Sequence, residues 1–370
     1  MFNLKNRYPI GIDINDQNIY ATQFQKTRQG LAIRGLYHRK LTSAHKNNTE
    51  PDDALTPVLK EISQNKRFRG KSVAIHLPAR HVYCFPVTFE IGAEETVKDG
   101  IVRECRRHLS FPLKEAVIDY PSIIDISTGK NKKFNAIIIA VRRAHIEQYS
   151  LLLKWAGLEV EAIDFNLSSL LRLHHYLFST KDAPIILCNI GHSQSIIAVV
   201  TKNSILAQRN TSWGIKHLLD SLKTNLELSG NSEQILGLIK KYGLNYEHQI
   251  SPGGGVSAKE NGDRNDEMEI SRTVFQILAP CVDDLMHQFY QITGYVGSEI
   301  QKIKFEEINM YGQASSINFL SQYIRKKFDI TTKCINPITK LSLSDNNLLP
   351  DTAEGAPFAL ALGLAMRKVT

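Results

Sequence analysis

The sequence lacks the features of a membrane-spanning or secreted protein. No apolar run reaches the roughly 18 residues that a transmembrane helix requires, and the stretch from Met1 to Tyr8 carries charges but no apolar signal region. We therefore expect a soluble, cytoplasmic chain whose short N-terminal tail leads into a strand. Its 370 residues allow two domains, or one split domain, with an ample core.

Motifs for metal binding and for nucleophilic catalysis are also absent. The five cysteines are scattered without a CxxC pair, which excludes a zinc ribbon and provides no disulfide framework. The twelve histidines form no HExxH motif, and no serine lies in a GxSxG elbow. We predict no metal site, and a hydrolase of the serine class is not expected.

The net charge of +8 suits several acidic partners, namely nucleic acid, an anionic membrane leaflet or an acidic protein. No aromatic-basic RNA motif and no helix-turn-helix signature accompanies this charge. A basic solvated surface is therefore favoured, and we expect no nucleic-acid partner.

One structural plan occurs twice, with 176 residues between Asp13 and Asn189 at the equivalent turns. In the first copy an apolar run at 10–14 and a polar turn precede alternating strands at 19–24 and 31–35. In the second copy the run at 184–190 and its turn precede strands at 196–201 and 205–208. A repeat of this length predicts two lobes of one design.

The rest of the chain mixes helical and strand periodicity. Strands are expected at 73–77, 82–89, 117–124, 134–141, 158–164 and 303–310. Helices are expected at 52–66, 94–109, 143–155, 166–178, 213–224, 232–242, 267–293, 316–328 and 357–366. The fold class is therefore α/β.

Four polar turns have the composition of phosphate-binding segments. They are Asp13–Asp16, Asn189–Ser193, Tyr311–Ser316 and Gly355–Phe358. Backbone N–H groups at a strand end or a helix start can bind phosphate, and a carboxylate there can hold water on Mg²⁺. Hairpin turns are rich in these residues for backbone reasons alone, so each turn by itself is a weak signal.

Three stretches carry a family resemblance when they are taken together. They are Pro9–Ile14, Glu94–Tyr120 and Pro357–Ala365. With the repeated hairpins, they resemble the PilM family of actin-like proteins of type IV pilus assembly, and the chain is also similar to the cytoplasmic part of GspL of type II secretion. The resemblance implies an actin-like (ribonuclease H-like) two-lobed fold. It places the first lobe at 1–180 with an inserted subdomain at about 35–124, and the second lobe at 181–370.

The resemblance also implies a nucleotide site between the lobes. Its residues would be Asp13, Asn15, Asp164, Asn189, Gly191, Ser193 and Gly312. The family pattern has Gly where Asn15 stands and Asp where Asn189 stands, and the Glu expected near Asn166 is missing. We therefore expect ATP and Mg²⁺ to bind weakly or not at all, and we assign no catalytic residue.

By the same resemblance, the partner is the cytoplasmic tail of a PilN-like inner-membrane protein, alongside other pilus assembly proteins. The inserted subdomain would bind this tail through Val82, Tyr83, Phe85, Val97, Ile101 and Arg103. Alternatively, Arg103, Arg106 and Arg107 would face lipid headgroups or solvent. The expected function is a cytoplasmic scaffold, peripheral to the inner membrane and in contact with it only through partners. The alternative is an active Mg²⁺-dependent ATPase that supports pilus assembly.

Overall fold

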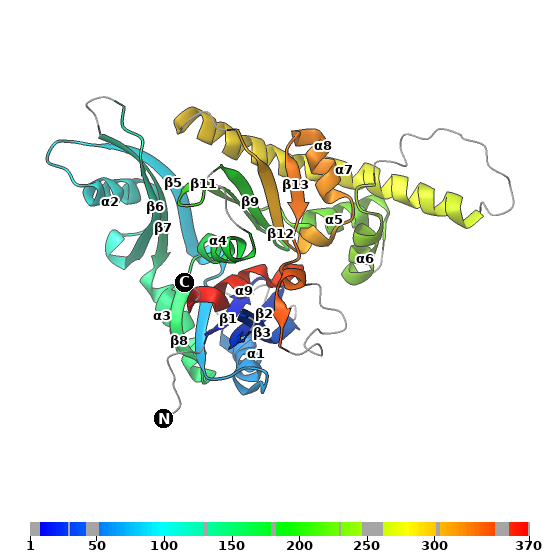
Figure 1. Ribbon diagram of the computed structural model, residues 1–370, viewed down its shortest axis with the longest axis horizontal. Coiled ribbons are helices and arrows are strands. Elements are labelled where there is room, and N and C mark those ends of the chain that lie inside the picture. Colours follow the sequence, from blue (N-terminus) through cyan, green and yellow to red (C-terminus); the bar gives the residue numbers. More distant parts are fainter. Residues whose placement is uncertain are drawn as a thin grey trace.

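The computed structural model describes residues 8–28, 30–41, 52–128, 132–178, 183–228, 231–245, 262–300, 304–344 and 355–368. These residues form two mixed sheets and a third, antiparallel sheet, with helices packed around them (Figure 1). Among the described helices, none combines the length and the apolar composition that a bilayer crossing needs.

The first sheet has the strand order β14-β3-β2-β1-β4-β8. An antiparallel meander, β3-β2-β1, continues into β4 and β8, which run parallel to β1. The strands are β1 (Ile10–Ile14), β2 (Asn18–Thr27), β3 (Gly30–Lys40), β4 (Ser72–His76), β8 (Glu159–Asp164) and β14 (Ser342–Leu343). Helices α1 (Asp52–Gln64) and α3 (Arg143–Trp155) pack against this sheet.

The second sheet repeats this plan with the order β11-β10-β9-β12-β13. Here β11-β10-β9 is the antiparallel meander, and β12 and β13 run parallel to β9. The strands are β9 (Ile185–Ile190), β10 (Ser195–Val200), β11 (Ile205–Thr211), β12 (Glu307–Gly312) and β13 (Thr331–Cys334). The packed helices are α5 (Ile215–Asn225), α6 (Ser232–Tyr242), α7 (Gly262–Glu299) and α8 (Leu320–Phe328). The predicted two lobes of one design are confirmed.

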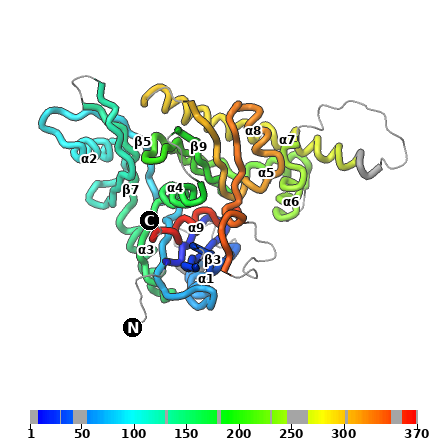
Figure 2. Tube along the Cα trace, in the orientation of Figure 1, coloured from blue at the N-terminus to red at the C-terminus, as the bar shows by residue number. Residues whose placement is uncertain are grey.

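Two helices lie between the sheets and join the lobes (Figure 2). All seven residues of α9 (Ala359–Ala365) are buried, and α9 packs on α4 (Asn166–Leu177) and on β1, β2 and β4. The backbone of α9 approaches β1 so closely that a Cβ on Gly11 would lie 2.1 Å from the Ala361 carbonyl oxygen. Only Gly at this position permits the contact.

The third sheet is antiparallel, with the order β5-β7-β6, and α2 covers one face. Its elements are β5 (Val82–Ile91), α2 (Val97–His108), β6 (Ala116–Asp125) and β7 (Lys132–Arg142). Strand β3 pairs with β2 and strand β4 pairs with β1, so both belong to the first sheet, and β7 carries the third sheet to Arg142. The domain boundaries, with an inserted subdomain at about 35–124, stay a prediction.

Candidate functional site in the cleft between the lobes

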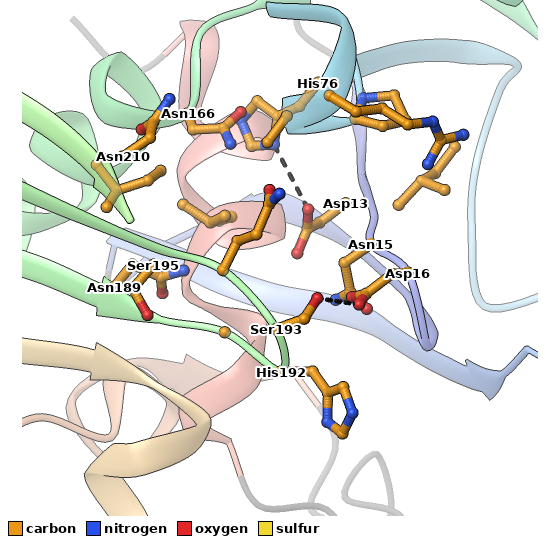
Figure 3. A pocket seen from close by; sticks show the side chains of 18 of the residues that line it. Asp13, Asn15, Asp16, His76, Asn166, Asn189, His192, Ser193, Ser195 and Asn210 are labelled. Carbon is orange, nitrogen blue, oxygen red and sulfur yellow. Dashed lines mark hydrogen bonds and ion pairs between the residues drawn. The ribbon is translucent and has the colours of Figure 1, made fainter. Parts of the chain in front are cut away.

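The two equivalent turns face one another across a cleft of about 180 Å³ (Figure 3). The first turn follows β1 and the second follows β9, so the repeat itself places them at corresponding positions. Polar residues that line the cleft are Asp13, Asn15, Asp16, His76, Arg80, Asn166, Asn189, His192, Ser193, Gln194, Ser195 and Asn210. Five of the seven predicted nucleotide-site residues lie here: Asp13, Asn15, Asn189, Gly191 and Ser193.

Asp13 is buried at the end of β1 and faces His76, with Oδ1 3.6 Å from Nδ1 (Figure 3). The other ring nitrogen of His76 lies 2.8 Å from Ser169 Oγ. Ser169 Oγ also lies 2.8 Å from the Asn166 carbonyl oxygen, so His76, Ser169 and Asn166 form one hydrogen-bonded chain. Nδ1 of His76 has no hydrogen-bond partner among the described residues and is directed at Asp13.

Asn15, which stands where the family pattern has Gly, stabilises the first turn. Its side-chain oxygen accepts hydrogen bonds from the backbone N–H groups of Gln17 (3.1 Å) and Asn18 (2.9 Å). Asn15 is not among the described residues with positive φ, so this turn does not need the flexibility of glycine. The Asn15 amide therefore caps its own turn.

The second turn is tied to the first by a hydrogen bond. Ser193 Oγ donates to Asp16 Oδ2 across the cleft. Gly191 N–H donates to the Gln194 carbonyl at 3.1 Å and closes the hairpin. The carboxylate of Asp16 therefore accepts a hydrogen bond from the second lobe.

Gly312 and Asp164, the other two predicted residues, do not line the cleft. Gly312 ends β12 with φ of 84°, and a Cβ there would lie 2.4 Å from the Ile190 carbonyl oxygen and 2.9 Å from Asn189 Oδ1. Gly312 thus supports the turn that carries Asn189. A side chain at this position would displace it.

Asp164 is held by arginines. Its Oδ2 lies 2.9 Å from Arg172 and 3.1 Å from Arg367. Burial raises the pKa of Asp164, but the charge of Arg172 and the hydrogen bonds from Phe165 N–H and Arg172 lower it more, so the carboxylate stays ionised. This geometry gives Asp164 a structural role, joining β8 to α4 and to the segment after α9.

A second cavity of about 300 Å³ lies beside the cleft and shares His192 with it. Tyr20 and His38 stack at 4.7 Å on one side, and Tyr20 meets Phe358 edge-on at 5.0 Å. Lys40 of β3 and Glu233 of α6 form an ion pair of 2.8 Å between the lobes. Aromatic faces beside cationic side chains suit a planar, anionic ligand.

A family model described as "Type IV pilus assembly protein PilM" matches residues 11–252 and 255–369. The chain belongs to the PilM family. Among solved structures, the chain is similar to one from a "PilM-PilN type IV pilus biogenesis complex", with TM-score 0.72, 16% identity and 99% of each chain covered. It is also similar to the ethanolamine utilization protein EutJ from Carboxydothermus hydrogenoformans, with TM-score 0.50, 12% identity and coverage of 98% and 90%. No curated protein matches the sequence.

These comparisons confirm the resemblance drawn from the sequence and the actin-like fold class. At 16% identity, the similarity to the PilM-PilN structure concerns the fold of the PilM-family chain. Nucleotide binding depends on the residues that line the cleft. No sequence motif indicates several of these residues.

The sequence patterns did not single out five polar residues of the cleft: His76, Arg80, Gln194, Ser195 and Asn210. His76 ends an apolar strand, where a lone histidine resembles any other core residue. Arg80 lies in a short connection without a distinctive spacing, whereas His192 lies within the predicted turn Asn189–Ser193. The carboxyl ends of neighbouring parallel strands lie at the same edge of a sheet. A residue at the end of β4, such as His76, is therefore expected near the end of β1, and this rule could have indicated it.

The predicted partner-binding residues fall into two environments. Val82, Tyr83 and Phe85 are half-buried on β5, where Tyr83 packs on Phe111 at 5.3 Å and Phe85 stacks on His108 at 4.7 Å. Ile101 is buried between α2 and the sheet, and Val97 packs against the same cluster. Arg103 donates to Glu95 and, at 2.7 Å, to the Glu90 carbonyl.

Proposed function

We propose that this PilM-family chain is a cytoplasmic scaffold of a type IV pilus assembly complex, peripheral to the inner membrane. The observation that carries the proposal is its family membership together with the TM-score of 0.72 to the PilM-PilN structure. The partner would be the cytoplasmic tail of a PilN-like membrane protein, which would hold the chain at the membrane. Nucleic acid has no role in this proposal.

The edge of β5 is the proposed attachment site for the tail. In the sheet order β5-β7-β6, β5 pairs with β7 on one side only. Pro86 lies in the middle of β5, and proline is tolerated at a sheet edge because its missing N–H points away from the ladder. An extended peptide would pair with the free edge of β5 next to Val82, Tyr83 and Phe85, where it receives no hydrogen bond from Pro86.

The α2 residues contribute to this site indirectly. Ile101 is only 2% exposed, so a partner would reach it only by displacing α2. Val97 and Ile101 would fix α2 on the sheet, and Arg103 would fix the β5 end of the third sheet through Glu95 and Glu90. We propose the tail contacts for β5 and a supporting role for these three residues.

Binding of fluorescent peptides from the tails of neighbouring inner-membrane proteins tests the scaffold. Tyr83→Ala with Phe85→Ala should weaken the cognate peptide at least about tenfold, since two half-buried aromatic contacts are lost. Tyr176→Ala removes an exposed aromatic side chain of α4 and should leave the affinity unchanged. Equal affinity for wild type and the double variant would refute the β5 site.

The cleft is proposed as a weakened nucleotide site. Asp13 and Asp16 are the residues that would hold Mg²⁺-bound water, and Arg80 and His192 would meet phosphate charge. Asp16 is already engaged by Ser193, and amides stand at Asn166 and Asn189, where carboxylates would position metal and water. ATP with Mg²⁺ would therefore bind weakly, and hydrolysis would be negligible.

An active ATPase is the second candidate, because Asp13 and Asp16 both remain in the cleft. Isothermal titration with Mg²⁺-ATP, followed by a phosphate-release assay, separates the two candidates. Low-micromolar affinity with steady phosphate release would establish the ATPase. Weak or absent binding supports the scaffold.

A further inference from the structure

The end of the first lobe opposite the cleft gathers the starts of three parallel strands. Strands β1, β4 and β8 point their carboxyl ends at the cleft, and Ile10 pairs with Val73 while Ser72 pairs with Glu159. Because β2 runs antiparallel to β1, the turn from β2 to β3 reaches this same end. This end faces down in Figure 1.

The C-terminal ends of α1 and α3 join these strands. Ser63, in the last turn of α1, accepts a hydrogen bond from Lys71 Nζ through its carbonyl oxygen. A Cβ on Gly157, two residues after α3, would lie 3.8 Å from Ser63 Oγ. Glu159 N–H donates to the Lys71 carbonyl at 2.8 Å, so the loops before β4 and β8 lie side by side.

Exposed cations dominate this surface, which we call the basic end. Its members are Lys26, Arg28, Lys66, Arg67, Arg69, Lys71 and Lys154. None of these side chains forms an ion pair with a residue that the structure describes. Two carboxylates lie nearby, the exposed Glu159 and Glu161, and Glu161 is already paired with Lys368 at 2.8 Å.

Within the described ranges, no carboxylate forms an ion pair with the cations of the basic end. Burial lowers the pKa of Arg34, and the charge of Arg69 lowers it further, so two guanidinium groups repel each other here. The basic run of α2 is different, because Arg103 pairs with Glu95 and Arg107 pairs with Glu104 at 2.9 Å. The cations of the basic end are therefore more available to an external anion than Arg103 and Arg107 of α2.

A large aromatic side chain lies among the cations of the basic end. Trp155, the last residue of α3, is 60% exposed, and Leu151 one turn earlier is 49% exposed. Tryptophan with lysine and arginine at one level is typical of surfaces that meet lipid headgroups, since the indole sits at the interface while the cations meet phosphates.

We propose that the basic end docks directly on an anionic lipid bilayer, with Trp155 and Leu151 entering the headgroup region. This contact would add to the attachment that a membrane partner provides. It departs from the expectation that the chain contacts the membrane only through partners. The exposed leucine beside the tryptophan favours a bilayer over nucleic acid, whose phosphates would gain nothing from it.

Vesicle sedimentation with the full chain tests the proposal. Vesicles of phosphatidylcholine with about 30% phosphatidylglycerol should bind the protein, and pure phosphatidylcholine should not. The Lys66→Glu and Arg69→Glu double variant should lower the partition coefficient at least about tenfold. Raising NaCl from about 0.1 M to about 0.5 M should release the wild type.

Tryptophan fluorescence locates the contact on the basic end. The chain has two tryptophans, and Trp213 is only 5% exposed, so a blue shift on adding anionic vesicles would come from Trp155. The shift should disappear in Trp155→Phe.

The Arg325→Glu and Lys326→Glu double variant on α8 carries the same change of charge on the second lobe and is the matched control. An equal loss of vesicle binding in this control, no binding of the wild type, or tighter binding to duplex DNA than to vesicles would overturn the proposal. All three measurements are made without a tail peptide, so they stand apart from the test of the scaffold.

Discussion

At the residue scale, position 189 decides the charge of the second turn. The family resemblance places Asp there, and the amide of Asn189 keeps the shape while lacking the negative charge. We predict that Asn189→Asp strengthens Mg²⁺-ATP binding about tenfold, because one charge-assisted contact contributes about 1–3 kcal/mol. Isothermal titration measures this change.

Asn210 also lines the cleft and serves as the control for position 189. Asn210→Asp adds the same charge on β11, away from the turn that faces Asp13, and should change the affinity little. If the wild type already binds Mg²⁺-ATP tightly and Asn189→Asp does not change the affinity, the proposal of a weakened nucleotide site is wrong.

We predict that His174 lowers the stability of the fold in acid. It is 2% exposed and lies 3.0 Å from the Tyr311 hydroxyl. Burial lowers the pKa of His174 to about 4, assisted by His175. The unfolded chain, with an ordinary pKa near about 6.5, binds the proton first, so stability falls by about 2–3 kcal/mol as pH drops from about 6.5 to about 4.

His174→Gln should flatten this loss of stability, while His287→Gln on the exposed face of α7 should retain it. Denaturant unfolding at several pH values measures the slope. Part of the slope should remain, because burial and the charges of His145 and Arg80 lower the pKa of His81 to about 4 as well. Parallel curves for wild type and His174→Gln would contradict the assignment.

At the element scale, α9 and the residues after it bind the first lobe through Asp164. Arg172 contacts Asp164 and also donates to the Gly363 carbonyl at 2.6 Å, so one carboxylate organises α4, β8 and α9. We predict that Asp164→Asn lowers the free energy of unfolding by about 1–3 kcal/mol, since two arginines lose their partner.

Mg²⁺-ATP titration should be unchanged in Asp164→Asn, because Asp164 does not line the cleft. Glu161→Gln removes a more exposed carboxylate of the same strand and should cost less stability. A nucleotide affinity that changes in Asp164→Asn without loss of stability would restore Asp164 to the site.

Local sequence patterns predicted the duplicated meander and most of the helices and strands, but not β13 and β14. Apolar runs such as Ile185–Ile190 and the polar turns after them carry that information directly. The pairing of β14 with β3 and the burial of α9 between the lobes depend on contacts between distant parts of the chain, which periodicity does not encode. For the same reason, the sequence could not show that Asp164 lies outside the cleft, because its partner Arg367 is remote in sequence.

At the scale of the whole molecule, the lobes are bridged by the chain's own side chains. Asp16 bonds Ser193, Lys40 pairs with Glu233 at 2.8 Å, and Asn135 of the third sheet donates to Tyr295 of α7 at 3.0 Å. These contacts join the two lobes at the cleft and join the third sheet to the second lobe.

A scaffold binds its partner with or without nucleotide, whereas a motor couples partner binding to hydrolysis. Isothermal titration of the cognate tail peptide into nucleotide-free protein, repeated with Mg²⁺-ATP, distinguishes the two. For a scaffold we expect the same affinity, within about threefold, in both titrations. Peptide binding that appears only with hydrolysable ATP, together with phosphate release, would contradict the scaffold proposal.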